Sequence, residues 1–177
     1  MSIAAALLPE FDHEMAGTRR ALERVPDAAL DWTPHPKSMS MRSLVTHLAN
    51  LPGWIVETIS RTELDMAPVD GEPWRAEPVA SVAEAVAAFD RHVAAAREAL
   101  AGASDAALLV NWTLLAADET IFSMPRAAVI RGFVLNHLVH HRGQLTVYLR
   151  LNDAPVPALY GPSADEEAAP GAETAQA

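Results

Sequence analysis

The residues best suited to chemistry in this sequence are two histidines spaced four apart, His137 and His141. Residues at this spacing lie on one face of a helix, so both imidazoles can reach the same metal ion, as in helix-borne zinc sites. On a helical wheel of about 100° per residue, they share the apolar face with Leu145 and Tyr148. Such a pair can also be two polar side chains on the surface, or core histidines hydrogen-bonded to carbonyls. Unpartnered buried imidazoles would each cost a few kcal/mol, and a shared cation removes that cost.

A third histidine, His47, lies on the apolar face of an earlier helical stretch, together with Leu51 and Trp54. Metal sites in helical bundles are usually built from side chains on facing helices. The sequence therefore predicts one metal site formed by His47, His137 and His141. No fourth protein ligand is evident, which leaves coordination positions for water or substrate, as is typical of catalytic metal sites.

The residues around this motif narrow the chemistry. Leu138 stands where the helical metalloprotease motif places its glutamate base, which disfavours peptide hydrolysis by that route. His140 points aside, and we assign it to support of the site or to an interface. Arg142 lies about 140° from His137, so it is expected to cap the helix, pair with an acid or pack at an interface. Gln144 is positioned to support a ligand by hydrogen bonding.

The remaining histidines and the tryptophans are expected to have other roles. His13 and His92 lie beside charged residues and should face solvent, while His35 lies between two prolines and should be structural. Trp54 shares the face of His47 and could line a substrate cleft. The other tryptophans, Trp32, Trp74 and Trp112, are expected in the core or in cleft walls.

The elements that must position the three histidines are helices. Apolar periodicity and capping residues predict four long helical segments, separated by proline-rich connections at 26–39 and 63–80. Residues 104–124 predict a short helix followed by extended chain or a hairpin. The predicted fold is all-α, a four-helix bundle. The four predicted helices are 2–25 with an interruption near Pro9, 40–62, 81–101 with a capping box at Ser81 and Glu84, and 125–152.

Composition excludes several classes of function. The chain has 177 residues, 50% of them hydrophobic, and a formal net charge of −10. That charge argues against binding to duplex nucleic acid or to an anionic membrane. The absence of cysteine excludes disulfides, thiolate ligands and a cysteine nucleophile. The N-terminus fails as a secretory signal, and no stretch approaches the ~18 apolar residues of a membrane span, so the expected location is the cytoplasm.

Two stretches resemble the DinB-like family of bacterial proteins, which is distinct from the DNA polymerase of that name. They are "LDWTPHPKSMSMRSLVTHLANLPGW" (30–54) and "MPRAAVIRGFVLNHLVHHRGQLTVYLRLNDAPVPALYGPSADE" (124–166). The polar, acidic composition of residues 163–177 predicts a disordered tail. The resemblance implies a DinB/YfiT-like bundle in residues 1–162, with up-down-down-up topology. It also implies a metal site from His47, His137 and His141, a homodimer, and kinship with transferases and isomerases that use small thiols.

Three hypotheses for function follow. The first is an enzyme that depends on a divalent metal, zinc or nickel, such as a small-thiol S-transferase or a related hydrolase or isomerase. Copper and iron also suit histidine-only ligation. The second is a non-catalytic metal-binding bundle for sequestration, sensing or stress response. The third, DNA binding, is suggested by the family name and disfavoured by the net charge.

Overall fold

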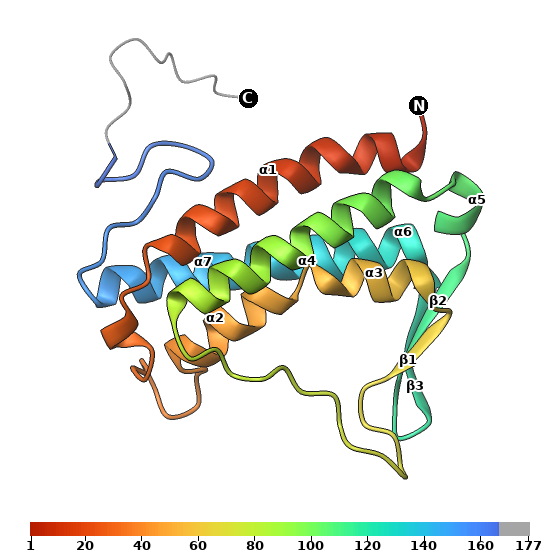
Figure 1. Cartoon of the computed structure of the whole chain (residues 1–177), viewed down its shortest axis with the longest axis horizontal. Helices are drawn as coiled ribbons and strands as arrows, with labels where there is room; N and C mark the ends of the chain where they lie inside the picture. The colour runs from red at the N-terminus through yellow and green to blue at the C-terminus, as the bar shows by residue number, and fades with distance from the viewer. Residues whose placement is uncertain (167–177) are drawn as a thin grey trace.

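Helices form most of the computed structural model, which describes residues 1–166 (Figure 1). The helical segments form a body with one continuous hydrophobic core, and a small sheet lies at one end. The longer helices are α1 (Ile3–Glu23), α2 (Met41–Asn50), α3 (Gly53–Ser60), α4 (Val82–Gly102) and α7 (His137–Leu151), and the shorter helical elements are η1 (Asp27–Ala29), α5 (Asp105–Leu108), α6 (Arg126–Ala128) and η2 (Val129–Asn136).

Serine side chains begin three of the longer helices. The Ser2 hydroxyl accepts a hydrogen bond from the backbone N–H of Ala5 and so caps α1. α1 continues through Pro9, so the predicted interruption there is wrong. At α4, the Ser81 hydroxyl accepts from the N–H of Glu84, as predicted, while the Glu84 carboxylate accepts from the N–H of Ala80. Ser40 caps α2 in the same way.

The predicted helix 40–62 is two helices, α2 and α3, with a break at Leu51 and Pro52. Proline has no backbone N–H and its ring clashes with the preceding turn, so Pro52 cannot continue α2. The break does not interrupt the buried face, because Leu48, Leu51 and Ile55 are all fully buried. The two helices therefore present one continuous buried face to the core, with a bend at the break.

The predicted fourth helix is a continuous run of helical turns from Arg126 to Leu151, but its middle is unusual. The segment η2 is a π-helix of eight residues, in which each turn is wider than in an α-helix. It ends at Asn136, and α7 then begins at His137. The wide turns thus lie directly before the first of the two α7 histidines.

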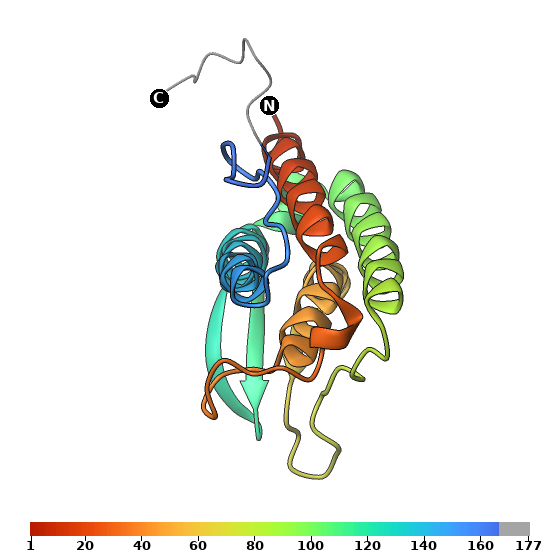
Figure 2. The same cartoon turned by 90° about the vertical axis from the view of Figure 1, so that its left-hand side faces the viewer.

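The helices surround the core in pairs. α1 packs against α4 and α7, α2 against α4 and α7, and α3 against α4 and η2. Figure 2 shows α7 on the opposite side of α2 from α4. The largest fully buried apolar side chains are Trp112, Phe11, Phe89, Leu22, Leu30, Met41, Leu44, Leu48, Leu51, Ile55 and Leu100.

The prediction of an all-α fold is wrong, because a three-stranded sheet is present. Its strands, in the order β1-β2-β3, are β1 (Glu63–Asp65), β2 (Asn111–Ala116) and β3 (Glu119–Pro125). β1 is parallel to β2, and β2 is antiparallel to β3. The fold is thus mainly helical with a small sheet, and the up-down-down-up topology stays a prediction. The short helix and hairpin predicted for 104–124 are confirmed as α5 and as β2 with β3.

The segment that follows α7 lies against α1 and α7. Arg24 on α1 contacts Glu166 at 2.5 Å, and Arg150 on α7 contacts Asp165 at 2.6 Å. The residues 163–166 of the predicted tail are therefore bonded to the helical body. The rest of that prediction, 167–177, lies outside the described residues. Within residues 1–166, no helix is both long and apolar enough to cross a membrane.

Candidate metal centre

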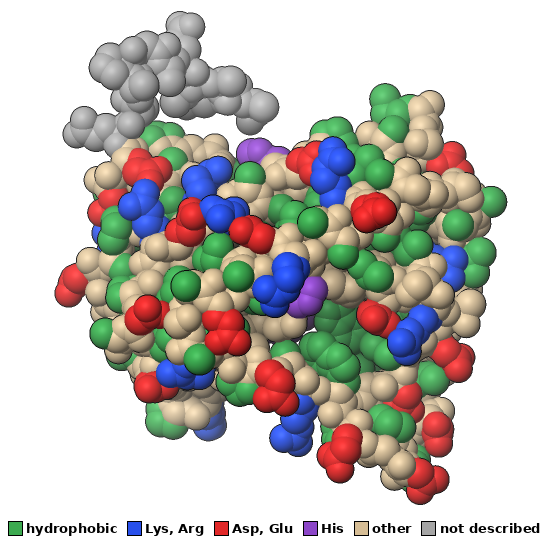
Figure 3. Space-filling view, viewed as in Figure 1, with side chains coloured by type: hydrophobic (Ala, Val, Ile, Leu, Met, Phe, Trp, Pro, Cys, Tyr) green, Lys and Arg blue, Asp and Glu red, His purple; other side chains and the backbone are tan. Residues whose placement is uncertain are grey.

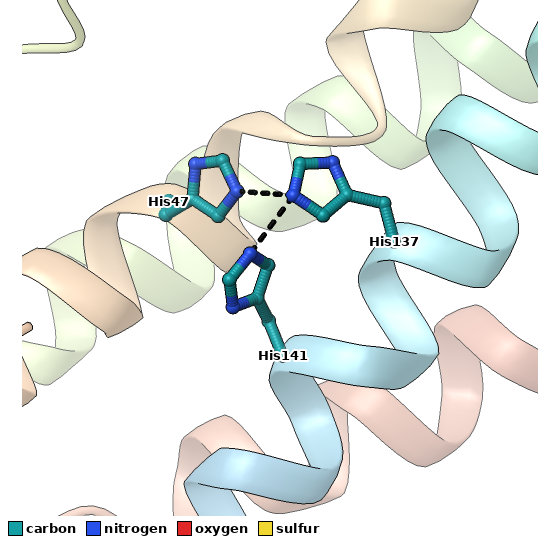
Figure 4. Close-up of side chains that lie close together, drawn as sticks. All are labelled: His47, His137 and His141. Carbon is teal, nitrogen blue, oxygen red and sulfur yellow. Dashed lines mark hydrogen bonds between the residues drawn. The ribbon is translucent and has the colours of Figure 1, made fainter. Parts of the chain in front are cut away.

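Three imidazole rings converge between α2 and α7 (Figure 4). His47 Nε2 lies 3.3 Å from His137 Nε2, which in turn lies 2.8 Å from His141 Nε2. The potential ligand atoms of the three residues all lie within 4.8 Å of one another, and each side chain is half-buried. The structure thus brings together the three histidines that the sequence singles out, from two elements about ninety residues apart.

The packing of two helices explains this convergence. On α2, His47 is flanked by the fully buried Leu44, Leu48 and Leu51, so its side chain is directed toward α7. On α7, the fully buried Leu138 and Leu145 fix the opposing face. The four-residue spacing then places His137 and His141 one helical turn apart on the side that faces α2.

Burial favours the neutral form of these imidazoles. The pKa of His47 is lowered to about 4, mainly by burial and then by the neighbouring His141 and His137. Burial is also the largest cause that lowers the pKa of His137, followed by the charge of His141. The pKa of His141 is lowered by burial, against a hydrogen bond with Gln144 that raises it. A neutral imidazole is the form that binds a metal.

The nitrogen spacing fits a first-row metal ion. Two ligands at a zinc–nitrogen distance of about 2.05 Å and a tetrahedral angle lie roughly 3.3 Å apart. The Nε2 atoms of His47 and His137 are 3.3 Å apart, while those of His137 and His141 are closer, at 2.8 Å. His137 Nδ1 is buried and makes no well-formed hydrogen bond. The donor set is all nitrogen, so the site could hold zinc or nickel, and the identity of the ion is open.

Gln144 supports the site as expected. Its Oε1 lies 2.7 Å from His141 Nδ1, and because an amide oxygen only accepts, Nδ1 carries the proton. The lone pair of His141 is then on Nε2, which faces the other two histidines. His140 is exposed and does not join the group of three, although its ring centroid lies 4.9 Å from that of His141.

Arg142 pairs with an acid, one of the roles expected from its position on the helix. Its Nη2 lies 2.6 Å from Glu14 Oε2, and the two side chains are 2% and 9% exposed. The Arg142 guanidinium also donates to the carbonyl of Glu14 and to the hydroxyl of Thr18. The Tyr160 hydroxyl contacts both members of the pair. We call this set, Arg142, Glu14, Thr18 and Tyr160, the buried ion-pair cluster.

The prediction that His92 faces solvent is wrong, whereas His13 is exposed as predicted. His92 is half-buried, and its Nδ1 lies 2.9 Å from the carbonyl oxygen of Ala49. Its ring packs over Gly53, where a Cβ atom would lie 3.4 Å from the imidazole. His35 is exposed in a loop, where its Nδ1 accepts from the N–H of Lys37, a structural role.

Aromatic side chains border one side of the histidine group. The Phe133 ring centroid lies 5.7 Å from that of His137, and the Trp54 centroid lies 5.5 Å from that of Phe133. Trp112 is fully buried and lies 6.5 Å from Trp54. Trp54 is itself 5% exposed, so its indole is enclosed by the core.

The fold and the site together define a mainly helical protein with a candidate three-histidine metal centre. The family model described as the DinB superfamily matches residues 10–145. The chain belongs to this superfamily, and the matched range contains all three histidines.

Individual relatives agree with this assignment. A DinB-like protein from Bacillus cereus ATCC 10987 is 22% identical, with a TM-score of 0.67 over 87% of this chain and 95% of that one. The DinB-like protein YjoA from Bacillus subtilis is 16% identical, with a TM-score of 0.66 over 88% and 99%. These two likenesses concern the fold alone. The uncharacterized protein YrdA of Bacillus subtilis (strain 168) is 38% identical over 71 residues, 38% of this chain and 42% of YrdA. The chain thus matches less than half the length of YrdA.

Proposed function

We propose that His47, His137 and His141 bind one divalent cation and that the loaded site activates a small molecule. The observation that carries the proposal is the convergence of the three Nε2 atoms, with all ligand atoms within 4.8 Å of one another. Exposed acidic clusters are common without a metal. Three half-buried neutral imidazoles at one point are different, because their nitrogens cost free energy when they lack partners, and a shared cation removes that cost.

The class of substrate that we propose is a low-molecular-weight thiol. A cation held by three histidines retains open positions, and it lowers the pKa of a thiol or water bound there, which supplies a nucleophile at neutral pH. The chain itself offers no cysteine, so any thiolate must come from a bound molecule. Within the chain, Gln144 holds His141 in the tautomer that binds metal, and Phe133 shields one side of His137.

Metal binding is tested on untagged protein, because a histidine tag would itself bind the ion. We expect elemental analysis to give one metal ion per chain, and titration with Zn²⁺ or Ni²⁺ to fit a single tight site. Single replacements of His47, His137 or His141 by Ala should each abolish tight binding. The matched control is His140→Ala, which removes the exposed neighbouring imidazole and should leave affinity unchanged.

Two results would overturn the metal proposal. One is that the untagged protein binds neither Zn²⁺ nor Ni²⁺ stoichiometrically when it is titrated with each ion. The other is an equal loss of affinity in the His140→Ala control and in the three test variants.

Catalysis is tested separately, with the metal-loaded protein, bacillithiol or mycothiol, and an electrophile such as 1-chloro-2,4-dinitrobenzene. Thiol transfer that is lost in His141→Ala and kept in His140→Ala supports the enzyme. The alternative is a non-catalytic metal-binding protein for sequestration or sensing. A metal that raises the melting temperature while no thiol is transferred would support that alternative.

We also propose a second copy of the chain as a partner and the cytoplasm as the location, both from the family resemblance. Light scattering on the eluted protein tests the dimer, and a mass equal to one chain at micromolar concentration would contradict it.

A further inference from the structure

A cavity lies beside Trp54 on α3. It has a volume of about 530 Å³ and opens between α3, α4 and the connection that carries Trp74. In the space-filling view, a hollow with hydrophobic walls opens on this face (Figure 3). None of His47, His137 and His141 lines the cavity, which is large enough for a small organic ligand.

Two indole rings form a corner of this cavity. The Trp54 and Trp74 centroids lie 5.3 Å apart, with an interplanar angle of 69°. Trp54 is 5% exposed and fixed in the core, whereas Trp74 is 43% exposed. The backbone N–H of Trp74 donates to the carbonyl of Met66 at 2.8 Å, which fixes the backbone at this residue. Both indoles line the cavity, and electron-rich indole rings are the environment that organic cations favour.

A carboxylate accompanies the indoles. Glu57 lines the cavity, and its Oε2 atom is buried. Arg61 Nε lies 2.9 Å from Oε2, but this contact is not a well-formed hydrogen bond. Arg61 also lines the cavity, and its side chain is 60% exposed, so solvent weakens both its attraction for Glu57 and its repulsion of a second cation. A cationic ligand would compete with Arg61 for the Glu57 carboxylate.

His92 adds an uncharged hydrogen-bond acceptor to the lining. Its Nδ1 lies 2.9 Å from the Ala49 carbonyl oxygen, which can only accept, so Nδ1 carries a proton. In the neutral imidazole, Nε2 is then a hydrogen-bond acceptor on a ring that lines the cavity. The net charge of −10 also favours attraction of a cation to the surface.

We propose that this cavity binds a small organic cation, an amine or a quaternary ammonium with an apolar body. The indoles of Trp54 and Trp74 would contact its charged head, and the Glu57 carboxylate would balance its charge. The site is separate from the histidine centre, because none of the three histidines lines the cavity.

The test uses the whole protein, both metal-free and loaded with Zn²⁺, and three ligands of one shape. Choline is the cation, 3,3-dimethyl-1-butanol its neutral counterpart and 3,3-dimethylbutanoate an anionic one. We expect calorimetry to detect choline binding and to show affinities at least about tenfold weaker for the other two. Glu57→Gln, which keeps shape and removes charge, and Trp74→Ala should each weaken choline binding by about tenfold.

Matched controls separate this site from other effects. Glu98 is an exposed carboxylate on α4 that does not line the cavity, so Glu98→Gln should leave choline affinity unchanged. His47→Ala should also leave it unchanged. Far-UV circular dichroism verifies that Trp74→Ala is folded, and Glu57→Gln gives a second, milder variant. Three results would overturn the proposal. The first is that no choline binding is detected at concentrations up to about 10 mM. The others are equal or tighter binding of the neutral or anionic ligand, and unchanged choline affinity in both cavity variants.

Discussion

The replacement Arg142→Met should strongly destabilise the protein, because it removes the cation from the buried ion-pair cluster. Methionine keeps most of the apolar length of the side chain and forms no ion pair. Arg142 is 2% exposed and Glu14 is 9% exposed, so water cannot replace the lost partner without a change in packing. The Glu14 carboxylate would remain in the interior between α1 and α7 with its negative charge uncompensated.

The magnitude follows from the contacts. Breaking one partner of a buried ion pair typically costs about 3–5 kcal/mol. Tyr160 donates to Glu14 Oε2 at 2.8 Å, and we expect this hydrogen bond to persist in the variant, which favours the lower end, about 3 kcal/mol. Since domains of this size are stable by about 5–15 kcal/mol, such a loss is a large part of the total. Adding Glu14→Gln removes the stranded charge, so the double variant should be more stable than Arg142→Met alone.

The assay is urea unfolding of the metal-free protein at neutral pH, followed by far-UV circular dichroism. Arg97→Met is the matched control, because Arg97 pairs with Asp12 at 2.8 Å where both side chains are about half exposed, 52% and 45%. This surface variant should leave stability nearly unchanged. The reasoning is refuted if Arg142→Met costs no more than Arg97→Met, or if adding Glu14→Gln brings no recovery.

Three further predictions concern the site and the first helix. Gln144→Ala should weaken Zn²⁺ affinity by about 10- to 100-fold with little change in melting temperature, because His141 loses the acceptor that fixes its tautomer; unchanged affinity in a zinc titration would contradict this. The metal-free protein should lose on the order of 2 kcal/mol of stability as the pH falls from 6.5 to about 4, since the pKa of His47 is lowered to about 4 and the unfolded chain binds a proton that the folded chain does not. Urea unfolding at several pH values measures this, and His47→Gln should reduce the slope. Pro9→Ala should raise stability by about 1 kcal/mol, because Pro9 is exposed inside α1 and alanine restores a helical N–H donor; a lower urea midpoint would count against it.

Much of the helical body could be predicted because its signals are local. Ser81 and Glu84 mark the start of α4, and the apolar period of 40–62 identifies the buried face that bears His47. The same period places His137 and His141 on one face of α7. These features depend on residues a few positions apart, where helix geometry alone determines which side chains are neighbours.

The features that could not be predicted from the sequence depend on contacts between residues that lie far apart in the chain. The angle of Arg142 on α7 suggests an acid, but Glu14 lies 128 residues away and no local pattern identifies it. The charged neighbours Asp90 and Arg91 suggest an exposed His92, yet Gly53 on another helix leaves space for its ring. β1 has only three residues, and it gains its hydrogen bonds from β2, nearly fifty positions later.

The buried ion-pair cluster also constrains the order in which the chain acquires its structure during synthesis. Glu14 is translated 128 residues before Arg142, an interval of roughly 6–26 s at about 5–20 residues per second. Throughout that interval the α1 carboxylate has no cation to accompany it into the interior, so the face of α1 that carries it must stay hydrated. α7 can therefore bury this face only late in translation, and the contact with Tyr160, 146 residues from Glu14, follows later still.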